Sequence, residues 1–295
     1  MQSEIRVIFP SSSCDRSLLQ NSIKLIEKLA PPIIYRIPKP HSSLPFLSSS
    51  IQNRVSELNT ALLDDNNTVI WCARGGYGAS DLLPFIPWEK LKKKRPKLLI
   101  GFSDVSAIQS ALFTKLGWPS LHAPMPGSLL WGKNGKKDLN NVLNIINKSK
   151  FSVKISVRPF HKKGPRCGPE VWLFGGCMSV LCSLIGTPYF PNSLRGALLF
   201  LEDTGETPGR ILRMFNQLLL SGALDKAAGL LFGNFGEGID LSPLLNEIAQ
   251  KISLPIYTSK DFGHVSPNMP LMIGAKANIK GNYLHWTYQK DISND

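Results

Sequence analysis

The sequence predicts an α/β protein in which an N-terminal doubly wound, mostly parallel sheet is followed by a second, smaller, β-rich α/β domain. Three observations predict this class. Apolar strand patterns alternate with amphipathic helix patterns over residues 4–116, the composition becomes basic and glycine-rich after residue 132, and a second series of strands and helices follows. Strand–helix alternation of this kind builds parallel sheets with right-handed crossovers.

In the first half, each predicted strand precedes a predicted helix. Short apolar runs predict the strands, and apolar residues three or four positions apart predict the helices. The predicted strands cover residues 4–10, 33–37, 68–73 and 98–102, and the predicted helices cover 17–30, 51–64, 79–86 and 104–116. Ligands bind beyond the carboxyl ends of such strands, so we expect the turns after 68–73 and 98–102 to lie together.

The middle of the chain has the composition of a connection between domains. We therefore expect an N-terminal domain over 1–148, an interdomain crossover over 149–168 and a C-terminal domain over 169–295. In the C-terminal domain, strands are predicted at 196–202, 227–235, 254–259 and within 270–287, and helices at 208–222 and 242–252.

Composition limits the class of protein. The chain has 295 residues, 43% of them hydrophobic, and a formal net charge of +13. No apolar run reaches the roughly 18 residues of a membrane helix, and no secretory signal is evident at the start. The basic run KLKKKRPK at 90–97 has no interleaved aromatic residues, which favours a solvated connector over an anion-contacting patch.

The five cysteines, Cys14, Cys72, Cys167, Cys177 and Cys182, are an odd number without CxxC spacing. This pattern argues against a disulfide framework and against a zinc ribbon. We expect a cytoplasmic protein with no metal and no cofactor, and we expect neither nucleic acid nor a membrane as its partner.

Ser103 is the candidate nucleophile, because it lies in the turn GFSD between an apolar strand and a helix. Gly101 permits close approach, and the amide of Asp104 is a natural oxyanion donor. The second glycine of G-x-S-x-G is absent, since Val105 stands there. The local sequence therefore leaves open that Ser103 or Asp104 only caps the following helix.

Glu202 and His264 are candidate partners for this serine. Glu202 ends the apolar strand GALLFLE, where a carboxylate needs a partner or a pocket edge. A structural ion pair with Arg210 or Arg213 is the alternative. His264 lies in the polar loop KDFGHVSPN, a suitable place for acid–base chemistry, and His122 is a candidate for lining the pocket near Ser103.

The glycine turn RGGYG at 74–78 follows a buried strand. It lacks the spacing of a nucleotide-binding loop, so we favour Gly76 as a second oxyanion donor over a phosphate cradle. Arg74 could pair with a substrate carboxylate, and Gly75 and Tyr77 are further candidates for substrate binding. Cys72 lies inside the strand pattern and is expected to be a buried, inert thiol.

Several blocks of the chain, in order, resemble the LD-carboxypeptidase family of serine peptidases, also called muramoyltetrapeptide carboxypeptidases. The blocks are ARGGYGASDLLPFI, IGFSDVSAIQSAL, FGGCMSVLCSLIGTPYF, LLFLEDTGETPGRILRMFNQLLLSGALDKAAGLLFGNF and LPIYTSKDFGHVSPNMPLMIGAKA. The resemblance runs from about residue 5 to 280.

The resemblance implies a catalytic triad of Ser103, Glu202 and His264, with oxyanion donors at the amides of Asp104 and Gly76. It implies cofactor-free hydrolysis of the amide that joins the L-centre of a diamino acid to a terminal D-alanine in murein tetrapeptides. This reaction belongs to peptidoglycan recycling in the cytoplasm. The family also implies two domains with the site between them, and often a homodimer.

Two departures concern substrate fit. Cys177 stands in the block GGC where the family usually has G-G-N, and VSPN follows His264 where GPPN is more usual. A sister branch of the family cleaves peptidyl-nucleotide toxins, so a peptidyl- or aminoacyl-nucleotide conjugate is the alternative substrate. A non-catalytic binder of anionic muropeptides or nucleotides is the remote alternative.

Overall fold

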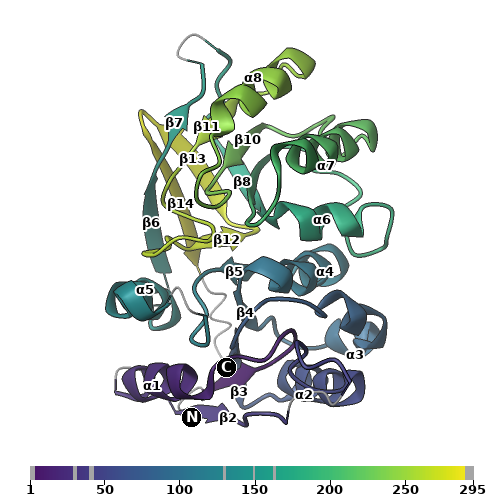
Figure 1. Ribbon diagram of the computed structural model, residues 1–295, viewed down its shortest axis with the longest axis vertical. Helices are drawn as coiled ribbons and strands as arrows, with labels where there is room; N and C mark the ends of the chain where they lie inside the picture. Colours follow the sequence, from purple (N-terminus) through teal and green to yellow (C-terminus); the bar gives the residue numbers. More distant parts are fainter. Residues whose placement is uncertain are drawn as a thin grey trace.

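Two β-sheets, each with helices packed on it, form the two stacked halves of the molecule (Figure 1). The computed structural model describes residues 4–28, 32–39, 43–128, 131–148, 150–161 and 164–289. The first sheet is mostly parallel and the second is mixed. The predicted α/β class with a parallel N-terminal sheet and a β-rich second part is therefore confirmed.

The first sheet has the strand order β12-β5-β4-β3-β1-β2. Its parallel strands are β1 (Glu4–Ile8), β2 (Ile33–Tyr35), β3 (Asn67–Cys72), β4 (Leu98–Gly101) and β5 (Ser120–His122). The order reverses at β1, which lies between β2 and β3, and such a reversal opens a crevice at the carboxyl ends of the strands. The turns that follow β3 and β4 lie at this edge.

Helices cover both faces of the first sheet (Figure 1). On one side lie α1 (Arg16–Glu27) and α5 (Trp131–Ile146), and on the other lie α2 (Ile51–Leu63), α3 (Trp88–Leu91) and α4 (Ser106–Leu116). The Asp15 side chain caps α1 by accepting from the amide of Leu18. Gly117 ends α4 in the left-handed conformation, where glycine carries no side-chain penalty.

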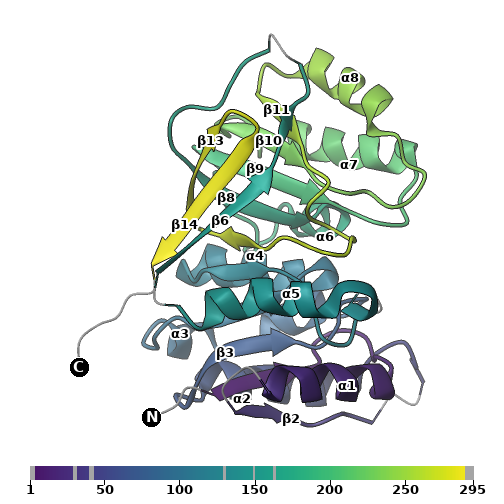
Figure 2. The same cartoon turned by 90° about the vertical axis from the view of Figure 1, so that its left-hand side faces the viewer.

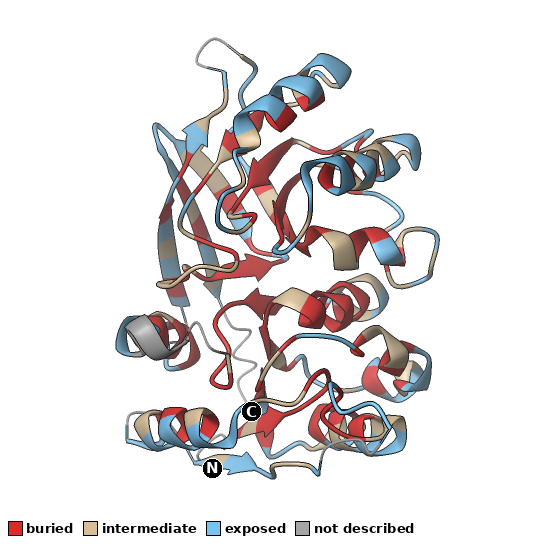
Figure 3. Ribbon diagram, viewed as in Figure 1, coloured by how far each residue is buried: buried red, intermediate tan, exposed pale blue. Residues whose placement is uncertain are grey.

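The second sheet has the order β6-β14-β13-β8-β9-β10-β11-β7. Its strands are β6 (Lys150–Ser156), β7 (Arg158–Pro159), β8 (Val171–Cys177), β9 (Ala197–Glu202), β10 (Gly229–Phe232), β11 (Ile256–Thr258), β13 (Lys276–Lys280) and β14 (Tyr283–Gln289). The helices α6 (Met178–Leu184), α7 (Pro208–Leu220) and α8 (Leu241–Lys251) pack beside it. Buried residues, red in Figure 3, are concentrated in the strands and on the inner faces of the helices.

The connection expected at 149–168 is partly regular structure. Residues 150–156 form β6, which pairs with β14 at an edge of the second sheet, and Figure 2 shows this long pair on the outside of the upper half. Phe151 and Ile155 are buried there, so the segment contributes to the core although its exposed face is basic. Among the described residues, the second sheet has eight strands and the first has six.

One strand of the C-terminal half belongs to the first sheet. β12 (Leu271–Ile273) pairs antiparallel with β5, and all three of its residues are buried. In Figure 1 this edge of the first sheet faces the second sheet. A three-residue apolar run carries no signal for which sheet it joins, and here it links the two halves.

Helix α4, which follows the candidate nucleophile, also joins the halves. Three hydroxyl residues spaced four apart lie on one side of it, as this spacing places residues on one helix face. The Ser106 hydroxyl accepts from the amide of Cys177, and Ser110 and Thr114 both donate to the carbonyl of Tyr189. The start of α4 is therefore fixed against the end of β8.

Two segments predicted as helices contain 3₁₀ structure. Residues 80–85 form a 3₁₀ helix that contains Pro84, and a 3₁₀ turn over Ser103–Val105 precedes α4. No helix in the described part of the chain has the length and apolar character needed to span a membrane.

Candidate active site

Ser103 lies on a sharp turn at the carboxyl end of β4. Its φ is +62°, and it is the one non-glycine residue with positive φ among the described residues. Residues other than glycine rarely adopt a positive φ, because the Cβ atom clashes with the backbone. Where they do, the residue often belongs to a functional site. A Cβ at Gly101 would lie 2.8 Å from Val105 Cγ1, so the turn requires glycine two residues before Ser103.

The glycine turn after β3 lies directly against Ser103. A Cβ built on Gly75 would lie 2.9 Å from the Cβ of Ser103, 3.1 Å from its Oγ and 3.3 Å from the amide nitrogen of Asp104. On Gly76, which has φ of +110°, a Cβ would instead meet the hydroxyl of Ser12. The expected meeting of the two turns is therefore observed, with Gly75 as the glycine in contact with the serine.

Hydrogen bonds hold this edge of the sheet together. The carboxylate of Asp104 accepts from the amide of Ala79 at 2.9 Å, and burial raises its pKa. The amide of Ser12 donates to the Gly75 carbonyl, and the amide of Tyr77 donates to the Ser12 hydroxyl. The side chain of Asp104 thus ties the serine turn to the glycine turn, while its backbone amide stays beside Ser103.

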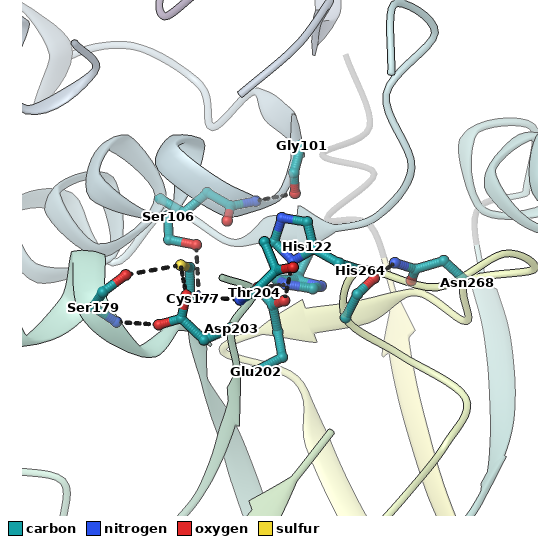
Figure 4. Close-up of polar contacts among 12 residues, drawn as sticks. Gly101, Ser106, His122, Cys177, Ser179, Glu202, Asp203, Thr204, His264 and Asn268 are labelled. Carbon is teal, nitrogen blue, oxygen red and sulfur yellow. Dashed lines mark hydrogen bonds and ion pairs between the residues drawn. The ribbon is translucent and has the colours of Figure 1, made fainter. Parts of the chain in front are cut away.

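The buried Glu202 and the partly exposed His264 form a hydrogen-bonded pair (Figure 4). Nδ1 of His264 lies 2.7 Å from Oε2 of Glu202, and because a carboxylate only accepts, Nδ1 is the donor. Burial alone would raise the pKa of Glu202, but the His264 charge and hydrogen bonds from two histidines outweigh it and hold that pKa at about 2. Burial lowers the pKa of His264, but the Glu202 charge raises it above its usual value.

Gly263 and Asp138 of α5 determine the conformation of the loop that carries His264. A Cβ at Gly263, which has φ of +105°, would lie 2.9 Å from the Cβ of Glu202, so only glycine lets the loop pass over this carboxylate. The Asn268 side chain donates to the Gly263 carbonyl. Asp138 of α5 accepts from the Asn268 amide at 2.7 Å and from the Ser266 hydroxyl at 3.1 Å.

His122 is placed differently from the expectation that it lines the pocket. It is fully buried on β5, behind Glu202, and its Nε2 lies 3.3 Å from Oε1 of that carboxylate. The rings of Phe102, Phe200 and Phe262 surround it. His122 therefore does not line the cavity next to Ser103.

Ser103 and His264 line one cavity of about 610 Å³ between the two halves. Arg74, Gly75, Gly76 and Asp104 line it as well, as expected for substrate or oxyanion contacts. The Arg74 guanidinium is held by a bond from Nη1 to the carbonyl of Ser13. No hydrogen bond joins Ser103 to His264, a contact that often tightens only when substrate is bound.

Tyr77 does not line this cavity. Its side chain is exposed and packs edge-on against Phe46, with ring centroids 6.0 Å apart. Acidic residues that the sequence analysis did not anticipate do line it, namely Asp203, Glu206 and Glu237. The position of Asp203 directly after Glu202 was the one available signal.

The cysteines do not resemble nucleophiles. Cys72 is fully buried and burial raises its pKa, in agreement with the inert thiol expected. Cys177 lines the cavity, but burial raises its pKa as well, and its Sγ lies 3.5 Å from Asp203 Oδ1. Within the described ranges, no group of His, Cys, Asp and Glu residues could hold a metal ion.

Comparison with known proteins matches both halves of the chain to one family. The model of the LD-carboxypeptidase N-terminal domain matches residues 5–123, and that of the LD-carboxypeptidase C-terminal domain matches residues 170–279. The murein tetrapeptide carboxypeptidase of Pseudomonas aeruginosa is 27% identical, over 96% of this chain and 94% of that protein.

Solved structures give the same result for the fold. The muramoyltetrapeptide carboxypeptidase from Oxalobacter formigenes has a TM-score of 0.85 and 28% identity, over 98% of this chain and 99% of that one. The microcin C7 self-immunity protein MccF, in complex with aspartyl sulfamoyl adenosine, has a TM-score of 0.82 at 19% identity, over 98% and 97%. The chain belongs to the LD-carboxypeptidase family, and it is a peptidase of the carboxypeptidase type.

Proposed function

We propose that this protein is a serine LD-carboxypeptidase that releases terminal D-alanine from murein tetrapeptides during peptidoglycan recycling in the cytoplasm. The observation that carries the proposal is the Glu202–His264 pair, 2.7 Å apart, at a cavity that Ser103 also lines on a positive-φ turn. The murein tetrapeptide carboxypeptidase of Pseudomonas aeruginosa and the muramoyltetrapeptide carboxypeptidase from Oxalobacter formigenes, both similar to this chain, support the substrate class.

In the proposed mechanism, Oγ of Ser103 attacks the carbonyl carbon of the L,D-amide, and Nε2 of His264 takes its proton. Glu202 holds the imidazole by Nδ1 and stabilises the cation that forms. The C–N bond then breaks, and His264 returns the proton to the amine of the leaving D-alanine. Water hydrolyses the acyl-enzyme by the same proton transfers in reverse order.

Backbone amides stabilise the oxyanion in this mechanism. The amide of Asp104 follows the nucleophile directly, and the glycine turn supplies the second donor from Gly76 or its neighbour Gly75. Arg74 would bind the carboxylate of the terminal D-alanine, because a guanidinium matches a carboxylate with two parallel hydrogen bonds. Free carboxyl ends would then be required, as in a carboxypeptidase.

The test is incubation with a tetrapeptide that contains diaminopimelate and ends in D-alanine, followed by mass spectrometry of the products. We expect release of D-alanine by the wild type and loss of release on Ser103→Ala. A wild type that releases none, or an S103A variant that is equally active, would refute the proposal.

A second arm addresses nucleotide conjugates, since MccF shares this fold. The enzyme is given an aspartyl-nucleotide conjugate in parallel with the tetrapeptide. Cleavage of the conjugate but not of the tetrapeptide would show that the substrate is a nucleotide conjugate and not a murein peptide. The proposed serine mechanism would be unaffected. Binding of either compound, with no acylation by a serine-directed probe, would indicate a non-catalytic binder.

A further inference from the structure

The carboxylate of Glu202 contacts two imidazoles, one on each oxygen. His264 occupies Oε2 at 2.7 Å, and His122 lies 3.3 Å from Oε1. The proposed triad uses only the first of these contacts. Glu202 and His122 are both 0% exposed, so the second contact is not a surface encounter.

The hydrogen-bond chemistry at His122 fixes its direction. A carboxylate oxygen only accepts, so Nε2 of His122 carries the proton and donates. Its Nδ1 has no hydrogen-bond partner among the described residues. Beside the rings of Phe102, Phe200 and Phe262 alone, a hydrocarbon side chain would be better suited than histidine, so the donor at Nε2 is what distinguishes histidine here.

The backbone holds His122 rigidly. In β5 it pairs with Gly101 of the nucleophile strand on one side and with Leu271 of β12 on the other. The ring of Phe102, which directly precedes Ser103, packs 4.9 Å from the ring of His264 and 5.7 Å from that of His122. His122 therefore presents a fixed donor from the first sheet to a carboxylate of the second.

We propose that His122 is a positioning residue for the Glu202–His264 pair. The terminal torsion of a glutamate is broad, and a carboxylate held at one oxygen can rotate about it. Held at both oxygens, Glu202 keeps Oε2 aimed at Nδ1 of His264. This inference rests on the proposed function, since it gives His122 a role in orienting the proposed base.

The contact also tunes the basicity of His264. Donation from His122 stabilises the Glu202 charge, so without it the carboxylate would attract the His264 proton more strongly. The other titratable groups around His264 and its cavity are Asp203, Asp138, Arg74, Asp104, Cys177, Glu206 and Glu237. The His122 variants keep all of these residues, so the variants differ from the wild type only at His122.

The test compares three variants. His122→Phe keeps a ring and removes the donor, His122→Gln places an amide N–H near the position of Nε2, and His122→Asn carries the same amide on a shorter side chain. The titration of His264 is followed by NMR of labelled histidine side chains, which needs no substrate. The rate of D-alanine release is measured against pH with the same proteins.

We expect His122→Phe and His122→Asn to raise the His264 pKa by about one unit and to move the acidic limb of kcat/KM equally. They should lower kcat roughly 10- to 100-fold with KM unchanged. His122→Gln should restore both properties toward the wild type. A purely structural role would reduce the amount of folded enzyme without shifting the titration.

Equal His264 titration in the wild type and His122→Phe overturns the proposal. If His122→Phe does not fold, His122→Gln and His122→Asn are compared instead. An equal His264 pKa and an equal kcat in these two variants would also overturn the proposal. A wild type that releases no D-alanine refutes the proposed function separately. In that case the NMR titration still tests the positioning role.

Discussion

Glu202 is a charge that the fold has placed where no water reaches it. Such a carboxylate is tolerated only when its oxygens are paired, since leaving one unpaired costs several kcal/mol. Here each oxygen has an imidazole partner. The same pairing that stabilises the buried charge also sets the proton affinity of His264.

The pH dependence of the activity follows from this pair. In the proposed mechanism, His264 must be neutral to accept the Ser103 proton. Burial lowers the pKa of His264, but the Glu202 charge outweighs burial and raises this pKa above its usual value of 6.5. We expect kcat/KM to fall as pH decreases through a midpoint above 6.5. In Glu202→Gln the charge is lost while burial remains, so the midpoint should move below 6.5, with kcat reduced by about 10⁴-fold.

Measurement of kcat/KM from pH 5 to 9 checks this expectation, because its acidic limb reports the free enzyme. Glu206→Gln is the matched control, since Glu206 lines the cavity but pairs with the exposed Arg210. An acidic limb that stays in place in Glu202→Gln would contradict the assignment of His264 as the base.

At Gly75, we expect an added methyl group to reduce activity without destabilising the fold. No positive φ is required there, so alanine fits the backbone, yet its Cβ would lie 2.9 Å from the Cβ of Ser103. We expect Gly75→Ala to reduce kcat/KM by at least about 100-fold through displacement of the nucleophile. The melting temperature should change little.

Activity assays and thermal melts of Gly75→Ala check this prediction. Gly168→Ala is the control, because a Cβ there meets nothing within 4 Å. Near wild-type activity in Gly75→Ala would show that the serine turn tolerates the displacement.

At the residue scale, the sequence predicted the candidate residues that lie in local motifs. It did not predict the contacts that form where the two halves of the molecule meet. Local patterns marked Ser103, Glu202 and His264 as candidates, and the family resemblance joined them into the expected triad. His122 was misplaced because its burial depends on β12 and on Phe200, which are far away in the sequence. Asp138 was missed for the same reason, since its partners are about 130 residues away along the chain.

At the scale of elements, the loop after Gly263 depends on helix α5 for its position. Asp138 is 1% exposed and accepts from both Ser266 and Asn268, and burial raises its pKa. Helix α5 therefore acts as the support of the segment that carries His264.

We expect Asp138→Ala to loosen this loop, since two donors lose their acceptor. The expected result is a roughly 10- to 100-fold lower kcat, with faster amide hydrogen exchange confined to residues 263–268. Asp138→Asn keeps one acceptor oxygen and should be intermediate. Amide hydrogen exchange is measured by mass spectrometry. Unchanged exchange rates in this loop in Asp138→Ala would contradict the supporting role of Asp138.

Elements with strong periodicity were predicted well. The first-half strands and the helices at 17–30, 51–64 and 208–222 correspond to observed elements, because their apolar spacing reflects the face that they bury. The segment 149–168 was predicted as a connection because its composition is basic and contains glycine and proline. Its pairing with β14 is a long-range contact that no local pattern reports.

At the scale of the whole molecule, the two halves share a sheet and a site. Strand β12 completes the first sheet, α4 bonds to the second half, and the His122–Glu202 contact spans both. Interfaces of this kind couple the stability of the parts that they join. We therefore expect the protein to unfold in a single cooperative transition.

Calorimetry of two core variants checks the coupling. Leu19 on α1 and Leu218 on α7 are both fully buried, one in each half. Each Leu→Ala change should cost about 2–5 kcal/mol and lower the same transition temperature. Two resolved transitions, each sensitive to only one of the variants, would show that the halves unfold independently.

The place of β12 in the first sheet also bears on how the protein is made. A ribosome completes β5 long before it reaches Leu271–Ile273, a delay of roughly 7–30 seconds at about 5–20 residues per second. Until then the edge of β5 is open to other strands. If the proposed mechanism holds, the nascent first half has the Ser103 turn without His264, and we expect it to be inactive until nearly the whole chain has been synthesised.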